Sequence, residues 1–320
     1  MSRRVAALDC GTNSLRLLVA EVDPGRGEMT DVARRMEIVR LGQGVDQTGR
    51  LAPEALARTI GVLRDYAAVI ASSAVEAVRI VATSATRDAD NAAEFVRQVK
   101  EVLGVAPEVL TGTEEAMLAF TGATAELGGH PDGAPFLVVD IGGGSTEFVL
   151  GGAGAAGPAE SAVRAISVNV GCVRLTERHL HGDPPSGPEV AAATADIDAA
   201  LEQVAGTLPV RQARTLVGLA GSVTTVAAIA MGLPGYDAAR IHHARVSAAD
   251  VHAVTRDLLA ETRTARAAIG VMHPGRVDVI GGGALVLDRV MQRFGFGEVL
   301  VSEHDILDGI AWSLTRNSPR

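Results

Sequence analysis

Short apolar runs that end at glycine-rich turns dominate the hydrophobic pattern of the chain. Residues 5–8 and 15–20 are two such runs on either side of a tight turn, which predicts strand, turn, strand. Residues 53–70 have apolar positions at helical spacing and begin with proline, whereas residues 78–82 have the character of a buried strand. This alternation predicts an α/β fold with largely covered mixed sheets.

Capping residues predict where further helices begin. Residues 83–90 are polar and predict a loop, followed by a helix that Asn91 caps with Glu94 three residues later. Ser186 and Glu189 have the same capping-box spacing before a helix that runs to residue 208. A final helix is predicted over residues 305–315, and the turn-rich segment 128–133 is the best linker candidate.

One pattern occurs twice in the chain, because residues 7–14 recur as residues 138–145, and each copy predicts strand, turn, strand. Asp9 aligns with Asp140, and the glycines and serines of the two turns also align. Small residues let backbone N–H groups converge on an anion, and an aspartate that ends the first strand is placed to hold Mg²⁺ against it. Two copies in register therefore predict duplicated phosphate-binding turns, which resemble those of the superfamily of actin, the sugar kinases and the heat-shock ATPases.

Two further glycine segments, residues 216–225 and 277–284, follow apolar runs that we interpret as strands, and both lead into helical patterns. Two explanations fit these glycines equally well. They allow close packing of a strand against a helix, or they contribute to the phosphate side of a ligand site. Both alternatives stay open at this point.

Composition excludes several classes of protein. With 320 residues the chain is long enough for two domains, and its net charge of −9 argues against non-specific nucleic-acid binding. Lys100 is the only lysine, which excludes a GK[ST] phosphate loop. Neither a signal peptide nor a membrane span is indicated, so we expect a cytoplasmic protein. Cys10 and Cys172 are expected to be buried small residues.

Five motifs together resemble the exopolyphosphatase / guanosine pentaphosphate phosphatase family. They are Asp-Cys-Gly-Thr-Asn-Ser at 9–14, Thr-Ser-Ala-Thr-Arg-Asp-Ala at 83–89, Gly-Thr-Glu-Glu-Ala at 112–116, Asp-Ile-Gly-Gly-Gly-Ser-Thr-Glu at 140–147 and Gly-Cys-Val-Arg-Leu-Thr-Glu at 171–177. The segments 274–280 and 302–304 resemble later motifs of that family. The resemblance implies two ribonuclease H-like (actin-like ATPase) domains with mixed sheets and an interdomain cleft. The first comprises residues 1–127 plus 305–320, because the last helix returns to it, and the second comprises residues 128–304.

The resemblance implies release of terminal orthophosphate from polyphosphate by water, with Mg²⁺, or alternatively Mn²⁺, as the metal. It implies catalytic roles for Glu115 and Glu147 and metal binding by Asp9, Asp140 and Glu147. Phosphate contacts are implied for Gly11, Thr12, Asn13, Ser14, Arg87, Gly142, Gly143, Gly144, Ser145 and Thr146, with a weaker match at Arg174. A homodimer is also implied, and neither a membrane nor nucleic acid is expected as a partner.

The charged residues of these motifs differ in whether the sequence also offers a structural explanation for them. Glu147 lies where the first copy of the repeat has Arg16. This difference suggests different roles, with the acidic Glu147 binding metal or water and the basic Arg16 binding phosphate. Glu114 forms a capping box with Thr111, whereas Glu115 matches the family's proposed base and has a solvated first-turn glutamate as its alternative explanation. For Arg87, a surface salt bridge is the alternative to phosphate contact.

Rival functions share the same chemistry. Hydrolysis of the 5′-phosphate of guanosine pentaphosphate (pppGpp) is the nearest, and a small-molecule kinase or a non-catalytic phosphate or nucleotide sensor is more distant. Larger family members have an additional C-terminal helical region that this chain lacks, so a preference for shorter polyphosphate is a hypothesis. The pairs His242-His243 and His179-x-His181 are expected to have surface roles, because no third metal ligand is legible.

Overall fold

The computed structural model describes residues 2–127, 133–152 and 163–316. The chain divides into two compact units, Met1–Gly122 with Ile306–Arg320, and Ala123–Asp305. The crossings, at which the chain passes from one unit to the other, therefore lie between residues 122 and 123 and between residues 305 and 306. The sequence analysis placed these boundaries at 127/128 and 304/305. Of the predicted linker, residues 128–132 lie outside the described residues. In the described ranges, no helix is both long and apolar enough to cross a bilayer.

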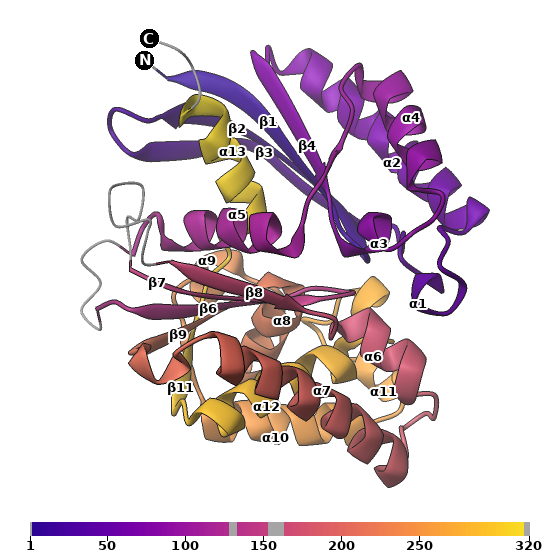
Figure 1. Cartoon of the computed structure of the whole chain (residues 1–320), viewed down its shortest axis with the longest axis vertical. Helices are drawn as coiled ribbons and strands as arrows, with labels where there is room; N and C mark the ends of the chain where they lie inside the picture. Colours follow the sequence, from indigo (N-terminus) through magenta and orange to yellow (C-terminus); the bar gives the residue numbers. More distant parts are fainter. Residues whose placement is uncertain (1, 128–132, 153–162, 317–320) are drawn as a thin grey trace. The chain divides into compact units, whose positions relative to one another are not determined.

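The first unit is built on a mixed sheet whose strands have the order β3-β2-β1-β4-β5 (Figure 1). β1 pairs antiparallel with β2 and parallel with β4. The strands are β1 (Arg3–Cys10), β2 (Ser14–Asp23), β3 (Glu28–Ile38), β4 (Ala77–Ala82) and β5 (Glu108–Val109). The helices are α1 (Val45–Thr48), α2 (Pro53–Ser72), α3 (Ser84–Arg87), α4 (Ala92–Leu103), α5 (Gly112–Thr124), which runs across the first crossing, and α13 (Ile306–Arg316).

Helices pack on the sheet of the first unit in a way that follows the alternation of its side chains. Ala6, Leu8 and Cys10 of β1 belong to one buried cluster with residues of α2 and α4. α13 packs on β1, β2 and β4, and Figure 1 shows it on the other side of this sheet from α2 and α4. The predicted helices that begin at Pro53 and near Asp305 and the predicted strand at 78–82 are thus confirmed.

A partly buried ion pair fastens α13 to this unit. Arg34 donates to both carboxylate oxygens of Asp308, which is fully buried, while the Arg34 side chain is 32% exposed. Burial lowers the pKa of Arg34, but the charge and hydrogen bonds of Asp308 outweigh that effect and raise it. Because removal of the arginine leaves a buried carboxylate without this partner, the arginine matters to stability.

We therefore expect Arg34→Met to lower the free energy of unfolding by about 3 kcal/mol, measured by urea titration. Arg26→Met is the matched control, because Arg26 is 73% exposed and its partner Glu28 is also exposed. That control should change stability by no more than about 0.5 kcal/mol. Equal effects of the two variants would contradict the prediction.

The second unit is built on a mixed sheet in the order β10-β11-β9-β6-β7-β8. β6 pairs antiparallel with β7 and parallel with β9. The strands are β6 (Phe136–Ile141), β7 (Thr146–Gly151), β8 (Arg164–Val168), β9 (Thr215–Leu219), β10 (Arg245–Ser247) and β11 (Glu298–Val301). The helices are α6 (Cys172–His179), α7 (Gly187–Thr207), α8 (Ala220–Ala230), α9 (Ala238–Ile241), α10 (Ala248–Ala260), α11 (Arg263–Ala267) and α12 (Ile280–Phe294), with 3₁₀ turns at Val210–Gln212 and Pro274–Arg276.

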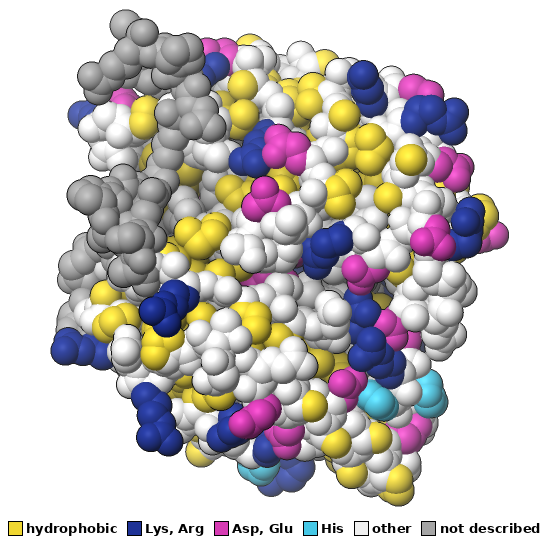
Figure 2. Space-filling model, viewed as in Figure 1, with side chains coloured by type: hydrophobic (Ala, Val, Ile, Leu, Met, Phe, Trp, Pro, Cys, Tyr) yellow, Lys and Arg dark blue, Asp and Glu magenta, His cyan; other side chains and the backbone are white. Residues whose placement is uncertain are grey.

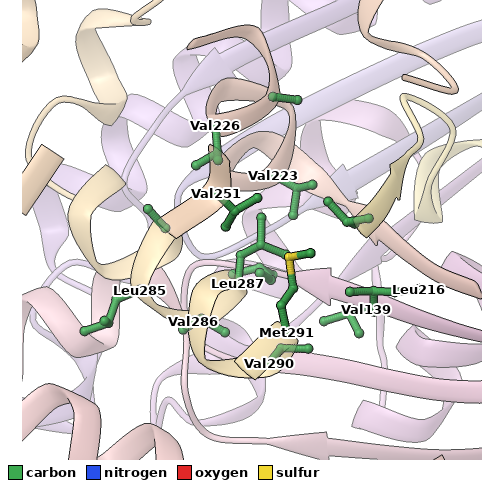
Figure 3. Close-up of a cluster of buried hydrophobic side chains, with 14 of the residues drawn as sticks. Val139, Leu216, Val223, Val226, Val251, Leu285, Val286, Leu287, Val290 and Met291 are labelled. Atoms are coloured by element: carbon green, nitrogen blue, oxygen red, sulfur yellow. The ribbon is translucent and has the colours of Figure 1, made fainter. Parts of the chain in front are cut away.

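The core of the second unit forms between its sheet and the helices α6, α7, α8, α10 and α12. Figure 3 shows Val139 and Leu216 of the sheet close to Val223 of α8 and Met291 of α12, and all four belong to one buried cluster. The predicted capping box of Ser186 and Glu189 at the start of α7 is confirmed. Both cysteines are free and buried, as predicted.

Three sequence predictions are wrong. Residues 83–90 are not wholly loop, because α3 occupies four of them. Asn91 precedes α4 without capping it, since its side chain binds both backbone groups of Leu51 instead. Residues 277–280 are not a strand, because residues 277–279 form a turn and Ile280 begins α12.

Close packing explains the glycine residues at the start of α12. A Cβ at Gly283 would lie 2.1 Å from the Ser222 hydroxyl, and one at Gly282 would lie 3.0 Å from the Cys172 carbonyl oxygen. Of the two alternatives left open for the glycines of 277–284, the packing explanation therefore has direct structural support. The segment 216–225 does form a strand followed by a helix, β9 and α8.

Candidate functional site

The first glycine turn is tightly tied to the rest of its unit. The N–H of Gly11 donates to the carbonyl of Ser14 at 2.9 Å and closes the turn between β1 and β2. The carbonyl of Asn13 accepts from two backbone N–H groups of residues 39 and 40, and the carbonyl of Thr12 accepts from Gly42. The Thr12 hydroxyl is buried and lies 2.8 Å from the Ser84 hydroxyl, at the start of α3. The turn is thus held by two segments distant in sequence.

Asp9 ends β1 beside this turn, and its charge has a partner. Asp9 and Arg16 are opposite each other in the antiparallel pair of β1 and β2. Nε and Nη2 of Arg16 both donate to Oδ2 of Asp9, at 3.0 and 2.7 Å. Asp9 is 4% exposed, so the acidic side of this ion pair is shielded from water, while the Arg16 side chain is partly exposed. Arg16, which is expected to contact phosphate, therefore binds Asp9, which is expected to bind metal. Both functional roles stay predictions.

Arg87 and Glu115, both predicted site residues of the first unit, contact each other. Nη1 of Arg87 is 3.2 Å from Oε2 of Glu115 and also donates to the carbonyl of Leu110 at 2.9 Å. Glu115 is 9% exposed. It is not the solvated first-turn glutamate of the alternative explanation, since it is buried and ion-paired. The predicted phosphate contact of Arg87 and the catalytic role of Glu115 themselves stay predictions.

The neighbouring Glu114 has the structural role predicted for it. Its Oε2 accepts from the backbone N–H of Thr111 at 2.8 Å and from the Thr111 hydroxyl at 2.7 Å, and the Thr111 hydroxyl accepts from the Glu114 N–H at 3.3 Å. These bonds from Thr111 lower the pKa of Glu114. The capping box is confirmed. The two adjacent glutamates therefore differ in role, because Glu114 caps the helix and Glu115 is a buried acid.

The second glycine turn lies between β6 and β7 and closes like the first, with the N–H of Gly142 donating to the carbonyl of Ser145 at 3.0 Å. Residues of helix α6 donate hydrogen bonds to the carbonyl oxygens of this turn. The N–H of Cys172 donates to Gly142, those of Val173 and Arg174 donate to Gly143, and Nε of Arg174 donates to Gly144.

This pattern determines where the amide hydrogens of the turn point. In a trans peptide unit the C=O and the following N–H point in opposite directions. The N–H groups of Gly143, Gly144 and Ser145 therefore point away from the elements that bind the preceding carbonyls. Three N–H groups on the same side of one turn form an anion-binding concavity. Thr146 differs, because its buried hydroxyl donates to the carbonyl of Val170 at 2.6 Å.

Gly171 allows α6 to approach the turn this closely. A Cβ at this position would lie 2.5 Å from the carbonyl oxygen of Gly143 and 2.6 Å from its carbon. Because these are backbone atoms, an added methyl group has to displace the turn or move α6.

We expect Gly171→Ala to lower the free energy of unfolding by about 1–3 kcal/mol, measured by urea titration. Gly187→Ala is the control, because no atom lies within 4 Å of a Cβ at that position and alanine favours a helix. An unchanged stability of Gly171→Ala would show that the turn adapts freely.

Two carboxylates lie side by side next to the second turn. Asp140 and Glu147 are directly opposite in the antiparallel pair of β6 and β7, at the positions that Asp9 and Arg16 occupy in the first unit. They are 7% and 2% exposed, and the Ser167 hydroxyl donates to Oε1 of Glu147 at 2.7 Å. Like charges directly opposite each other in a sheet repel, and carboxylate oxygens are the ligands that Mg²⁺ prefers. The two residues fit a divalent cation.

The structure thus places the predicted site residues in two groups, one per unit. The first group contains Asp9, the turn 11–14, Arg87 and Glu115, and the second contains Asp140, the turn 142–145 and Glu147. Ser84, Ser167 and the backbone-binding role of Arg174 were missed by the sequence analysis. Ser84 lies within the motif 83–89, so the motif itself was the signal, whereas nothing in the sequence near Ser167 indicated its contact with Glu147.

These features define a class of protein. In each unit the first three strands are antiparallel, a glycine turn joins the first two, and a later strand pairs parallel with the first. An acidic residue lies at or near the end of the first strand of each unit. This is the duplicated α/β architecture of the actin-like ATPase fold, with one glycine turn per unit.

The chain belongs to the Ppx/GppA phosphatase family, whose model matches residues 18–317. It is 53% identical to exopolyphosphatase 2 of Mycobacterium tuberculosis over 97% of this chain and 98% of that protein. A crystal structure of an exopolyphosphatase-like protein superposes with a TM-score of 0.92 at 45% identity, covering 98% of this chain and 99% of the other. The Ppx/GppA protein of Aquifex aeolicus gives a TM-score of 0.81 at 31% identity, with full coverage of both chains.

Proposed function

We propose that this chain is an exopolyphosphatase, which releases the terminal orthophosphate of inorganic polyphosphate by Mg²⁺-assisted attack of water. The observation that carries the proposal is the 53% identity to a protein named exopolyphosphatase 2 along nearly the whole of both chains. The buried carboxylate pair and the two anion-binding turns supply chemistry that this reaction needs.

Each group of residues has a role in the proposed reaction. Asp140 and Glu147 would hold Mg²⁺, which would neutralise phosphate oxygens and stabilise developing negative charge. The N–H groups of residues 143–145 bind phosphate oxygens. Glu115 takes a proton from the attacking water, whose oxygen bonds to the terminal phosphorus while the bridging P–O bond breaks. The products are orthophosphate and a chain shorter by one unit.

Arg87 orients Glu115 in this proposal. Its guanidinium is held by the carbonyl of Leu110, so the carboxylate that it contacts is also fixed. A general base works best when its position is fixed before the substrate arrives.

The test measures phosphate release by the purified chain, with Mg²⁺, from polyphosphate of defined length and from pppGpp in parallel. The proposal expects turnover of polyphosphate with the higher kcat/KM. Turnover of pppGpp alone would replace the proposed substrate by its nearest rival, and release from neither would refute the hydrolase. Titrating Mn²⁺ in place of Mg²⁺ in the same assay tests the metal. The homodimer and the cytoplasmic location stay predictions.

A further inference from the structure

Three possible metal ligands from distant parts of the sequence converge within the second unit. Glu126 follows α5, His242 follows α9, and His304 follows β11. Nε2 of His242 is 3.3 Å from Oε2 of Glu126, and Nδ1 of His304 is 3.6 Å from the same oxygen. We propose that this triad, Glu126–His242–His304, binds a divalent transition metal of the Zn²⁺ type. The surface roles expected for His242 from sequence thus change once its neighbours are known.

The distances within the triad suit such an ion. Zn²⁺ binds His nitrogen and carboxylate oxygen at about 2.0–2.2 Å, so two ligands of one tetrahedral ion lie about 3.3–3.5 Å apart. The two measured separations, 3.3 and 3.6 Å, are close to that value, and the three ligand atoms lie within 4.8 Å of one another. Small side-chain rotations are enough to close the site.

The donor atoms also select the metal. Two imidazole nitrogens and one carboxylate favour zinc, copper or nickel, whereas Mg²⁺ favours oxygen ligands alone. The triad is therefore chemically different from the pair Asp140–Glu147, and each site can be loaded with its own ion. Among the residues that the structure describes, the triad is the one group of three side chains with this arrangement.

Both histidine rings are accessible, the ring of His242 packs on a neighbouring ring, and the backbone of His304 is held in place. The side chains of His242 and His304 are 22% and 27% exposed, and that of Glu126 is 54% exposed, so an ion can enter from solution. The ring of His243 stacks on His242 with centroids 3.8 Å apart. The Ser302 hydroxyl donates to the carbonyl of His304 at 2.8 Å and accepts from its N–H at 3.0 Å. Three protein ligands leave a coordination position for water.

The hydrogen bonds of His242 define what the metal must displace. The backbone N–H of Glu303 donates to Nδ1 of His242 at 3.1 Å. In the neutral ring the proton is then on Nε2, which donates to Glu126. A metal at Nε2 requires the other tautomer, so the proton moves to Nδ1 and the bond from Glu303 breaks. Metal binding therefore changes the tautomer of this one histidine, and that change is measurable.

The position of the triad along the chain predicts an effect on stability. The second unit runs from Ala123 to Asp305, so Glu126 and His304 lie close to its two ends in the sequence. The three ligands of one ion come together only when the unit has folded. Because the ion binds the folded unit, it raises the unfolding temperature by mass action.

The test titrates Zn²⁺ into the untagged full chain by calorimetry, in millimolar Mg²⁺ so that oxygen-only sites are saturated. We expect one Zn²⁺ per chain and weaker binding by at least about tenfold in both Glu126→Gln and His304→Ala. His252→Ala is the matched control, because His252 also contacts a carboxylate, that of Asp288 at 3.2 Å, but belongs to no group of three ligands among the described residues. The control should bind Zn²⁺ like the unmodified chain.

A second measurement follows the ring nitrogens of ¹⁵N-histidine-labelled chain by NMR. On adding Zn²⁺, the proton of His242 should move from Nε2 to Nδ1, and the signals of His252 should not change. Circular dichroism without metal establishes that the variants fold. The proposal is overturned if Zn²⁺ does not bind, if His304→Ala binds it as tightly as the unmodified chain, or if the His242 tautomer stays the same at saturation.

Discussion

Glu115→Gln is expected to abolish most phosphate release, lowering kcat by a factor on the order of 10² to 10⁴. The amide has almost the shape of the carboxylate, and its oxygen can still accept from Arg87. It cannot take a proton from water at neutral pH. The loss should therefore appear in kcat, with little change in KM, because substrate binding does not require the missing proton transfer.

Glu114→Gln is the matched control for this experiment. The two glutamates are adjacent on α5, but Glu114 is exposed and bonded to Thr111, whereas Glu115 is buried against Arg87. The control should retain the kcat of the unmodified chain and show only a small change in thermal stability. If Glu115→Gln retains full turnover while folded, another group is the base.

Asp140→Asn and Glu147→Gln are expected to remove the response of the protein to Mg²⁺. In the unmodified chain, Mg²⁺ bound as proposed should relieve the repulsion between two buried carboxylates and raise the unfolding temperature. In either variant one negative charge is gone, so the metal-free protein should be as stable as the unmodified chain or more stable. Phosphate release should fall on the order of 10²-fold or more, since each of these side chains is a proposed ligand of the metal.

Thermal unfolding with and without Mg²⁺ is the measurement for both variants, alongside phosphate release over a range of Mg²⁺ concentrations. Asp9→Asn in the same assay separates two roles of Asp9. Loss of its ion pair with Arg16 lowers stability equally with and without Mg²⁺, whereas loss of a metal ligand lowers only the gain that Mg²⁺ produces. An undiminished response to Mg²⁺ in both Asp140→Asn and Glu147→Gln would locate the metal elsewhere.

Much of the fold was predictable because its signals are local. The turn residues at 11–14 and 142–145, the proline that begins α2 and the capping box of Ser186 each specify a local backbone conformation, and the structure has the predicted elements there. The separate roles of Glu114 and Glu115 were likewise suggested by spacing, because only one of two adjacent glutamates can reach back to Thr111.

The errors occur where distant contacts override a local preference. Asn91 is a good N-cap, but the backbone of Leu51 competes for its side chain. The segment 277–280 is rich in β-branched residues and resembles a strand, yet Gly282 and Gly283 pack against α6 and α8 as the first turn of a helix. The ion pairs of Arg16 and Arg87 join residues that the motifs treat as independent, so only the folded chain could show them.

The hydrogen bonds from α6 to the second turn have a further consequence for how a ligand binds. A turn whose three carbonyl groups are already bonded cannot rotate its peptide planes without breaking those bonds. Its amide hydrogens are therefore preorganised, and in the proposed function an incoming phosphate has to displace water but does not have to order the backbone. The entropy of fixing this loop is lost once, when the unit folds, so each successive phosphate of the proposed substrate would meet the same rigid surface.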